Sequence, residues 1–313
     1  MIWIPLRIVY ARGRRDGDMA YRMKRSDETC EEALRRIAIE EVDAALAEID
    51  DAAMDLHDKV HQVRKRAKRL RGLIRLVRAS FPDYAAENAA IRDAARRLSG
   101  LRDLEGMVET VDKLAEATGA EGLAPLRDHL IAVRDSAVAG SDVAADLAAF
   151  RADLVALRAR AEGWSLTETG FKAMRPGLEK VFARACRDRR LAAETPETAV
   201  IHDWRKAVKY HWYHTRLLQP LDPSPMDRRA NEVRRLSEFL GDHHDLAVLD
   251  AWLAGLADPP GGEEVRTALR ARIAARQGVL ETDAQALATR LFASRARDLS
   301  RRWKRLWKAW RTA

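Results

Sequence analysis

Residues 61 to 78 read HQVRKRAKRLRGLIRLVR, and residues 202 to 219 read HDWRKAVKYHWYHTRLLQ. The second stretch repeats the basic pattern of the first about 141 residues later, with a histidine at its start and Arg or Lys at the same later positions. On a helix these positions fall within an arc of about 100°. The sequence therefore predicts two helices that each carry a cationic stripe, formed by His61, Arg64, Lys65, Lys68 and Arg75 in the first and by His202, Arg205, Lys206, Lys209 and Arg216 in the second.

Each predicted helix also has an apolar face opposite its stripe, which can pack against a core. A solvated outer face is the ordinary interpretation of a cationic stripe, but solvated faces usually mix both signs of charge. Residues 57 to 78 contain nine Lys or Arg and one acid, Asp58. Like charges four residues apart repel by roughly 0.2–0.5 kcal/mol per pair. Because this costly pattern occurs twice, we favour a ligand-binding face, and the ligand we expect is a polyanion.

The composition is typical of a protein built from long helices. Of the 313 residues, 47% are hydrophobic and 33% are charged, and the net charge is +8. Helical periodicity is nearly continuous and no segment alternates with a period of two, so we expect an all-α fold. Charged residues interrupt every apolar run before the roughly 18 residues that a membrane span needs. The two cysteines, Cys30 and Cys186, lack the spacing of a metal or redox motif and fit a reducing cytoplasm.

The chain divides into two similar halves. A second motif also repeats, as LSGLRDLEGM at 98 to 107 and LGDHHDLAVL at 240 to 249. Two motifs that keep their order and spacing predict an internal duplication, with residues 24–163 and 164–312 as two helical repeats that form bundles related by an approximate two-fold axis. In the first repeat we expect one long helical stretch over 84–117. Residues 1–23 precede the helical pattern and are predicted to be a disordered extension.

These motifs resemble the CHAD domain, the conserved-histidine α-helical domain, over residues 24–312. The family pattern is a His-x-x-Arg-x-x-x-(Lys/Arg) helix followed by a Leu-Gly-x-x-Arg-Asp-like element, with the pair duplicated. Both cationic helices match the first part, and the elements after them match with Leu98, Arg102 and Asp103, and with Leu240, Gly241, His244 and Asp245. Ser99 and His244 depart from the pattern, because the family has Gly and Arg at these positions.

The resemblance implies two four-helix bundles whose basic helices line a central groove or pore. It also implies binding of inorganic polyphosphate without catalysis, association with polyphosphate granules in some members, and no cofactor; divalent cations would come with the polyanion. Asp103 and Asp245 are expected to pair with basic side chains and orient them. The first helix is expected to bind more strongly, since Trp212 and Tyr213 stand where the first has Arg71 and Gly72. The expected polyphosphate-binding residues are His61, Arg64, Lys65, Lys68, Arg69, Arg71, Arg75, Arg102, His202, Arg205, Lys206, Lys209, Arg216 and His244.

Two alternative functions stay open. A pI of about 9.7 permits nucleic-acid binding, although aromatic residues make up only 6% of the chain and do not interleave with the stripes. A phosphate-compound hydrolase is the second alternative, since His243, His244 and Asp245 are candidate metal ligands. We do not favour a metal site, because the corresponding residues 101–103 contain no His.

Three further features are not part of the repeated basic pattern. The C-terminal segment 294–313 carries eight Lys or Arg, with Trp303, Trp307 and Trp310 on one face. This composition is typical of a membrane-surface helix and also of a terminal helix that docks its Trp face on the bundle, and we favour docking. His211 lies on the apolar side of its helix and is expected to be structural, whereas His214 is expected to be peripheral.

Overall fold

The computed structural model describes residues 21–119, 122–140 and 142–312. This part of the chain is all-α, as predicted, and contains eleven α-helices, one 3-10 helix and no strand. None of the described helices is long and apolar enough to cross a membrane. The helices are α2 (Cys30–Asp50), α3 (Leu56–Leu76), α4 (Tyr84–Arg97), α5 (Ser99–Thr118), α6 (Ala124–Ala139), α7 (Val143–Ala161), α8 (Gly170–Glu194), α9 (Thr198–Leu217), η1 (Gln219–Leu221), α10 (Pro223–Ala254), α11 (Gly262–Leu291) and α12 (Ala296–Thr312).

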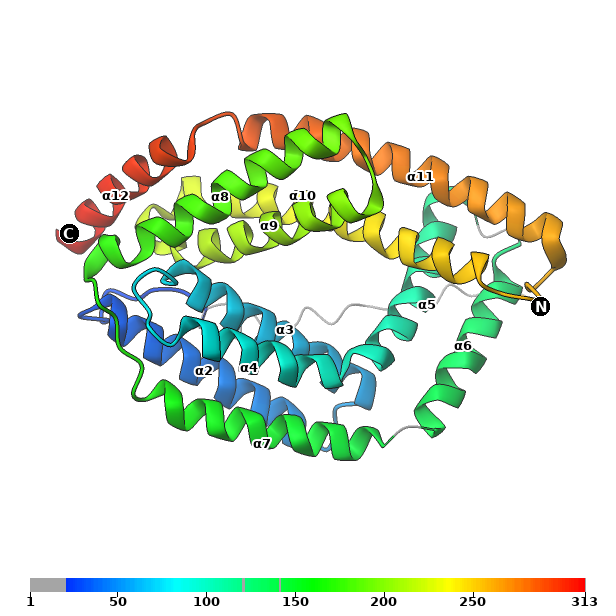
Figure 1. Ribbon diagram of the computed structural model, residues 1–313, viewed down its shortest axis with the longest axis horizontal. Coiled ribbons are helices and arrows are strands. Elements are labelled where there is room, and N and C mark those ends of the chain that lie inside the picture. The colour runs from blue at the N-terminus through cyan, green and yellow to red at the C-terminus, as the bar shows by residue number, and fades with distance from the viewer. Residues whose placement is uncertain (1–20, 120–121, 141, 313) are drawn as a thin grey trace.

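The helices form two packed groups (Figure 1). In the first, α2 packs against α3 and α7, and α4 packs against the same two helices. In the second, α8, α9, α10 and α11 pack in sequence, and α12 lies on α8. Contacts of α3 with α8 and α9 join the groups. Helices α5 and α6 pair with each other, α5 reaches across to α10, and His129 of α6 lies against Trp252 of α10.

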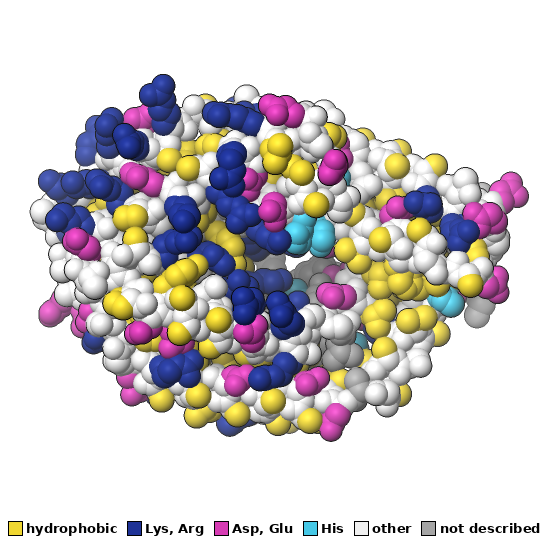
Figure 2. All heavy atoms as spheres, viewed as in Figure 1, with side chains coloured by type: hydrophobic (Ala, Val, Ile, Leu, Met, Phe, Trp, Pro, Cys, Tyr) yellow, Lys and Arg dark blue, Asp and Glu magenta, His cyan; other side chains and the backbone are white. Residues whose placement is uncertain are grey.

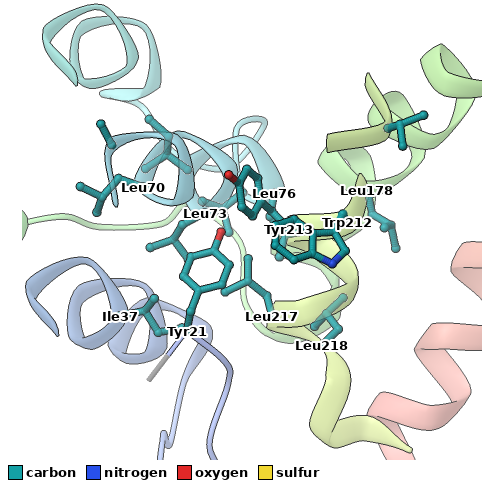
Figure 3. Close-up of a cluster of buried hydrophobic side chains, with 14 of the residues drawn as sticks. Tyr21, Ile37, Leu70, Leu73, Leu76, Leu178, Trp212, Tyr213, Leu217 and Leu218 are labelled. Atoms are coloured by element: carbon teal, nitrogen blue, oxygen red, sulfur yellow. The ribbon is translucent and has the colours of Figure 1, made fainter. Parts of the chain in front are cut away.

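The larger buried core holds residues from both predicted halves of the chain. It extends from Tyr21 to Trp310 and includes side chains of α2, α3, α8 and α9, of which Figure 3 shows a part. A smaller core joins α5 and α6 to the far ends of α10 and α11. The buried side chains therefore do not separate at residue 163, because both cores cross it.

The first buried residues lie earlier in the chain than we predicted. Residues 1–20 of the predicted extension lie outside the described residues. Tyr21 and Met23 are 1% and 2% exposed. The Tyr21 hydroxyl donates a hydrogen bond to the Arg69 carbonyl oxygen at 2.8 Å, and the Met23 amide donates to the Leu217 carbonyl oxygen at 3.0 Å. The predicted boundary at residue 23 is therefore too late, since these residues belong to the core.

The helical stretch predicted over 84–117 is divided into two helices. Leu98 leaves helical geometry, with φ −92° and ψ 19°, between α4 and α5. Its side chain is 1% exposed, and the weak helix formers Ser99 and Gly100 follow it. The break turns α5 away from α7 and toward α6 and α10. In the second half, α10 continues as one helix through the corresponding residue, Leu240.

The two basic helices, α3 and α9, cross where Gly72 meets Tyr213. A Cβ atom on Gly72 would lie 2.9 Å from the Tyr213 Cβ, so only glycine permits this approach. His214 lies at the same crossing, where its Nε2 is 3.2 Å from the Gly72 carbonyl oxygen and donates to it. The side chain of His214 is fully buried. The expectation that His214 is peripheral was therefore wrong, because the crossing encloses it.

Candidate polyanion-binding site

The cationic stripes of α3 and α9 converge at one place. The pKa of the Lys209 ammonium is lowered to about 8, chiefly by burial and then by the charges of Arg205, Lys68 and Lys65, while the carboxylate of Glu238 in α10 acts in the opposite direction. These cations come from both helices, so their charges lie within electrostatic reach of one another. We call Lys65, Lys68, Arg205 and Lys209 the cationic cluster. Figure 2 shows a hollow near the middle of the molecule, with Lys and Arg side chains gathered along one side of it and His at its edge.

Aromatic rings of α9 support the cations of the cluster. The Lys209 ammonium lies 4.3 Å from the centre of the Trp212 ring and 5.7 Å from that of Tyr213. The Arg216 guanidinium lies 5.6 Å from the same Trp212 ring. Trp212 and Tyr213 are buried. These rings stabilise the nearby charges by cation–π attraction.

The next part of the α3 stripe, Arg71 and Arg75, is held by α4. The Asn88 side-chain oxygen accepts from Arg71 Nε at 3.1 Å and from Arg75 Nη2 at 3.3 Å. Arg75 also donates to the Tyr84 hydroxyl at 3.0 Å and lies 4.2 Å from the Tyr210 ring centre. Burial lowers the pKa of Arg71. Neither arginine forms an ion pair within the described residues, so both guanidiniums are held by neutral partners.

The remaining stripe residues of α3 differ in exposure. His61, Lys65 and Lys68 are exposed, whereas Arg64 is half-buried. Arg64 Nη1 donates to the carbonyl oxygen of Ala95 at 2.8 Å, near the end of α4. The exposed side chains can reach a ligand directly, and Arg64 ties the stripe to the neighbouring helix.

Arg69 points away from the stripe. It is 4% exposed, and its Nη1 lies 3.3 Å from the carboxylate of Glu41, which Arg66 also contacts at 3.2 Å. This buried ion pair joins α3 to α2. Arg69 is therefore unavailable to a ligand, and the structure removes it from the expected binding residues, because its position on the helix faces the core.

In α9, Arg205 and Lys206 have different surroundings. The Arg205 guanidinium lies against Gly241 of α10: a Cβ atom on Gly241 would be 3.6 Å from the Arg205 Nε. Lys206 forms an ion pair with Asp203 at 3.0 Å, on its own helix. Arg205 is half-buried and has no ion-pair partner among the described residues. Of the two, Arg205 carries the charge that is less compensated.

His202 of α9 and His244 of α10 form a close pair of tilted rings. Their ring centres are 4.1 Å apart, with an angle of 32° between the planes. The pKa of each is lowered to about 4, first by burial; Lys206 and Arg205 add to this for His202, and His202 and Arg205 for His244. Both rings are therefore neutral at neutral pH. Each Nδ1 is buried without a hydrogen-bond partner in the described part of the chain.

The structure describes the side chains of only part of the second repeated motif, residues 98–107 and 240–249. The backbone of Arg102 lies in α5, but its side chain is outside the described residues. Asp103 is exposed and Asp245 is half-buried. The expected pairing of these two carboxylates stays a prediction. Among the described residues, no group of three or more His, Cys, Asp or Glu is placed to hold a metal ion.

Sequence reasoning missed the supporting residues of the site. Tyr84 and Asn88 are four residues apart on one face of α4, where both contact Arg75. Tyr210 lies beside the second stripe and supports a cation of the first. Only the spacing of Tyr84 and Asn88 was visible in the sequence, and it does not show which helix they face.

The family model of the CHAD domain matches residues 36–254, more than half of the chain. The chain belongs to the CHAD domain family. Its structure is similar to the crystal structure of the CHAD domain from the plant Ricinus communis, with a TM-score of 0.63 and 20% sequence identity over 84% of this chain and 91% of the plant chain. At this identity, the likeness shows a shared fold. No curated protein matches this CHAD chain.

Proposed function

We propose that this CHAD protein binds inorganic polyphosphate at the cationic cluster and along the neighbouring Arg71 and Arg75, without turning it over. The observation that carries the proposal is the convergence of Lys65 and Lys68 with Arg205 and Lys209. Cations within electrostatic reach of one another repel, and a chain of phosphates relieves that repulsion by replacing water and counterions. Arginine offers forked donors to phosphate oxygens, and lysine adds point charges.

The surroundings of the cluster favour polyphosphate over nucleic acid. Binding of single strands without sequence preference uses aromatic rings on which bases stack. Here Trp212 is covered by Lys209 and Arg216, and Tyr210 by Arg75. Lys or Arg side chains thus cover the rings nearest the cationic cluster, where bases would otherwise stack. Polyphosphate has no bases and needs no such platform.

We further propose that the fold is a duplicated pair of four-helix bundles, with α3 and α9 as equivalent helices. Gly72 and Tyr213, which meet at the crossing of these helices, are separated by the same 141 residues as the two stripes. Equivalent residues meet where a two-fold axis passes through a helix crossing. The contact of Gly72 with Tyr213 is therefore expected if such an axis relates α3 and α9. An axis at this place would bring the two stripes to one site, and attachment to polyphosphate granules would use that site.

Competition binding tests the proposed function. Labelled long-chain polyphosphate bound to the full chain is challenged with unlabelled polyphosphate, single-stranded DNA and triphosphate at two salt concentrations. We expect polyphosphate to displace the label best at equal charge concentration, and its affinity to fall steeply with salt because bound counterions are released. Displacement by DNA at equal charge concentration would show a general polyanion binder and contradict the proposal.

A further inference from the structure

The C-terminal helix α12 uses its tryptophans for docking. Trp303 and Trp310 are 1% and 7% exposed, and Trp303 stacks against the buried His211 with ring centres 6.0 Å apart. Trp307 is half-buried against Phe171 at 6.5 Å. The side of α12 that would insert into a bilayer is thus used to pack against the protein. Of the two interpretations of this helix, the structure supports docking.

A row of exposed cations runs along α12 beside this docked face, and its last member, Arg311, lies 5.8 Å from the ring centres of both Trp307 and Trp310. Arg297, Arg301, Lys304, Lys308 and Arg311 follow one another at intervals of three or four residues, which places them within an arc of about 80° along roughly 20 Å of helix. Arg302 and Arg305, also exposed, lie beside this row. The only acid in the helix is Asp298.

Few of these charges are compensated. Arg301 lies 3.4 Å from Asp298, and Arg311 donates to the carbonyl oxygens of Asp27 and Glu28. Arg297, Lys304 and Lys308 have no ion pair within the described residues. Like charges at this spacing repel each other, so the row costs stability unless an anion lies on it. Lys and Arg side chains are dense over this end of the molecule in Figure 2.

We infer that the α12 row is a second polyphosphate-binding surface, which holds part of a long chain whose other part lies at the cationic cluster. This inference rests on the proposed function. The row is complementary in charge to a phosphate chain, and it offers no free apolar face for a membrane. In Figure 1, α12 lies at one end of the molecule, away from the middle of α3 and α9. Only a long chain can therefore reach both surfaces.

Two surfaces on one chain produce avidity. The second contact is intramolecular, so its effective concentration is high and the gain in affinity is large even when the contact is weak. The α12 helix also lies beyond residues 36–254, which the family model matches. The second surface is thus a feature of this chain that the matched part of the CHAD domain does not account for.

The test compares affinities for short and long polyphosphate. The α12 variant carries Arg301→Gln, Lys304→Gln and Lys308→Gln. The matched control carries Arg151→Gln, Arg158→Gln and Arg270→Gln, which change the net charge equally and remove surface ion pairs with Asp50, with Asp43 and Glu162, and with Asp250. We expect the α12 variant to lose about tenfold or more in affinity for long chains, and to keep its affinity for chains of about five phosphates. Its salt slope for long chains should fall by about 2, at roughly 0.7 per lost contact.

The outcomes separate this inference from the proposed function. If the α12 variant binds long chains as tightly as the control does, the second surface is wrong while the cluster site stands. If it loses short and long chains equally, the row acts only through net charge, and the inference is also wrong. Binding of neither chain by the unaltered protein would contradict the proposed function itself. Vesicles of phosphatidylcholine and phosphatidylserine form a further arm, and α12-dependent vesicle binding with unchanged long-chain affinity would assign the row to anionic lipid instead.

Discussion

Lys68 and Arg69 are neighbours in α3, yet only Lys68 faces solvent. Successive residues of a helix point about 100° apart around its axis, so Arg69 points toward α2 and contacts Glu41 there. The sequence pattern was sufficient to place the stripe positions at three- and four-residue intervals. It was not sufficient to exclude Arg69, since the carboxylate that pairs with it is 28 residues away in the chain. A basic residue next to a stripe therefore needs its partner to be known before it is counted in a site.

The His202–His244 pair predicts proton uptake on binding. With a pKa of about 4, both rings are neutral in the free protein near pH 5.5, and a phosphate chain beside them would raise both pKa values by favouring the charged form. Affinity should therefore rise as the pH falls, by up to about one log unit per pH unit for each proton taken up. Calorimetry in two buffers of different ionisation enthalpy measures this uptake. A His202→Gln, His244→Gln variant should lower the buffer dependence, and an equal dependence in the variant or none in the unaltered protein would contradict the prediction.

His211 predicts a loss of stability in acid. Its Nε2 accepts a hydrogen bond from Arg229 at 3.0 Å, and burial holds its pKa well below the usual 6.5. Below about pH 6.5 the unfolded chain binds a proton that the folded chain does not, so the free energy of unfolding falls by roughly 1.4 kcal/mol per pH unit. Urea denaturation between about pH 7.5 and pH 5.5 measures the effect. His211→Gln keeps an acceptor for Arg229 and should remove about 1.4 kcal/mol of the loss; an unchanged pH dependence would show that His211 is not responsible.

At the scale of elements, the crossing of α3 and α9 depends on Gly72. A Cβ there would lie 2.9 Å from Tyr213 and 3.0 Å from the Tyr21 hydroxyl. Gly72→Ala should therefore lower the free energy of unfolding by about 1–3 kcal/mol, since an overpacked core must shift. Gly106→Ala in α5 is the control: nothing lies within 4 Å of its Cβ position, and it should raise stability by up to about 1 kcal/mol. Equal effects of the two substitutions in urea denaturation would contradict a tight crossing.

Helix periodicity was enough to predict that the chain is all-α, because each long segment has an apolar face that only a helix can bury on one side. It did not predict the break at Leu98. Leu98 itself is an apolar, buried residue that fits the helical pattern; Ser99 and Gly100 after it weaken the helix, and the packing of α5 against α6 and α10 sets the new direction. Helix ends that are set by tertiary packing leave little trace in local sequence.

At the scale of the molecule, the sequence pattern was more informative about the cationic residues than about how the buried core is divided. The repeated stripes predicted that α3 and α9 share a site, which stays a prediction; the structure shows that the charges of Lys65 and Lys68 of α3 act on Lys209 of α9. The halves predicted on either side of residue 163 share one large core, since α3 packs against both α8 and α9. Long-range packing of this kind depends on side-chain shape at the crossing, which periodicity does not encode.

The affinity of short-chain polyphosphate for a Lys68→Gln, Arg205→Gln variant tests the central claim most directly. One substitution lies on each helix, and both side chains reach solvent, so folding should be retained. We expect a loss of at least about tenfold, and a salt slope reduced by about 1.4 relative to the unaltered protein. A double variant of Arg151→Gln and Arg270→Gln changes the net charge equally and should bind normally. If the cluster variant binds short chains as well as this control does, polyphosphate does not lie between α3 and α9.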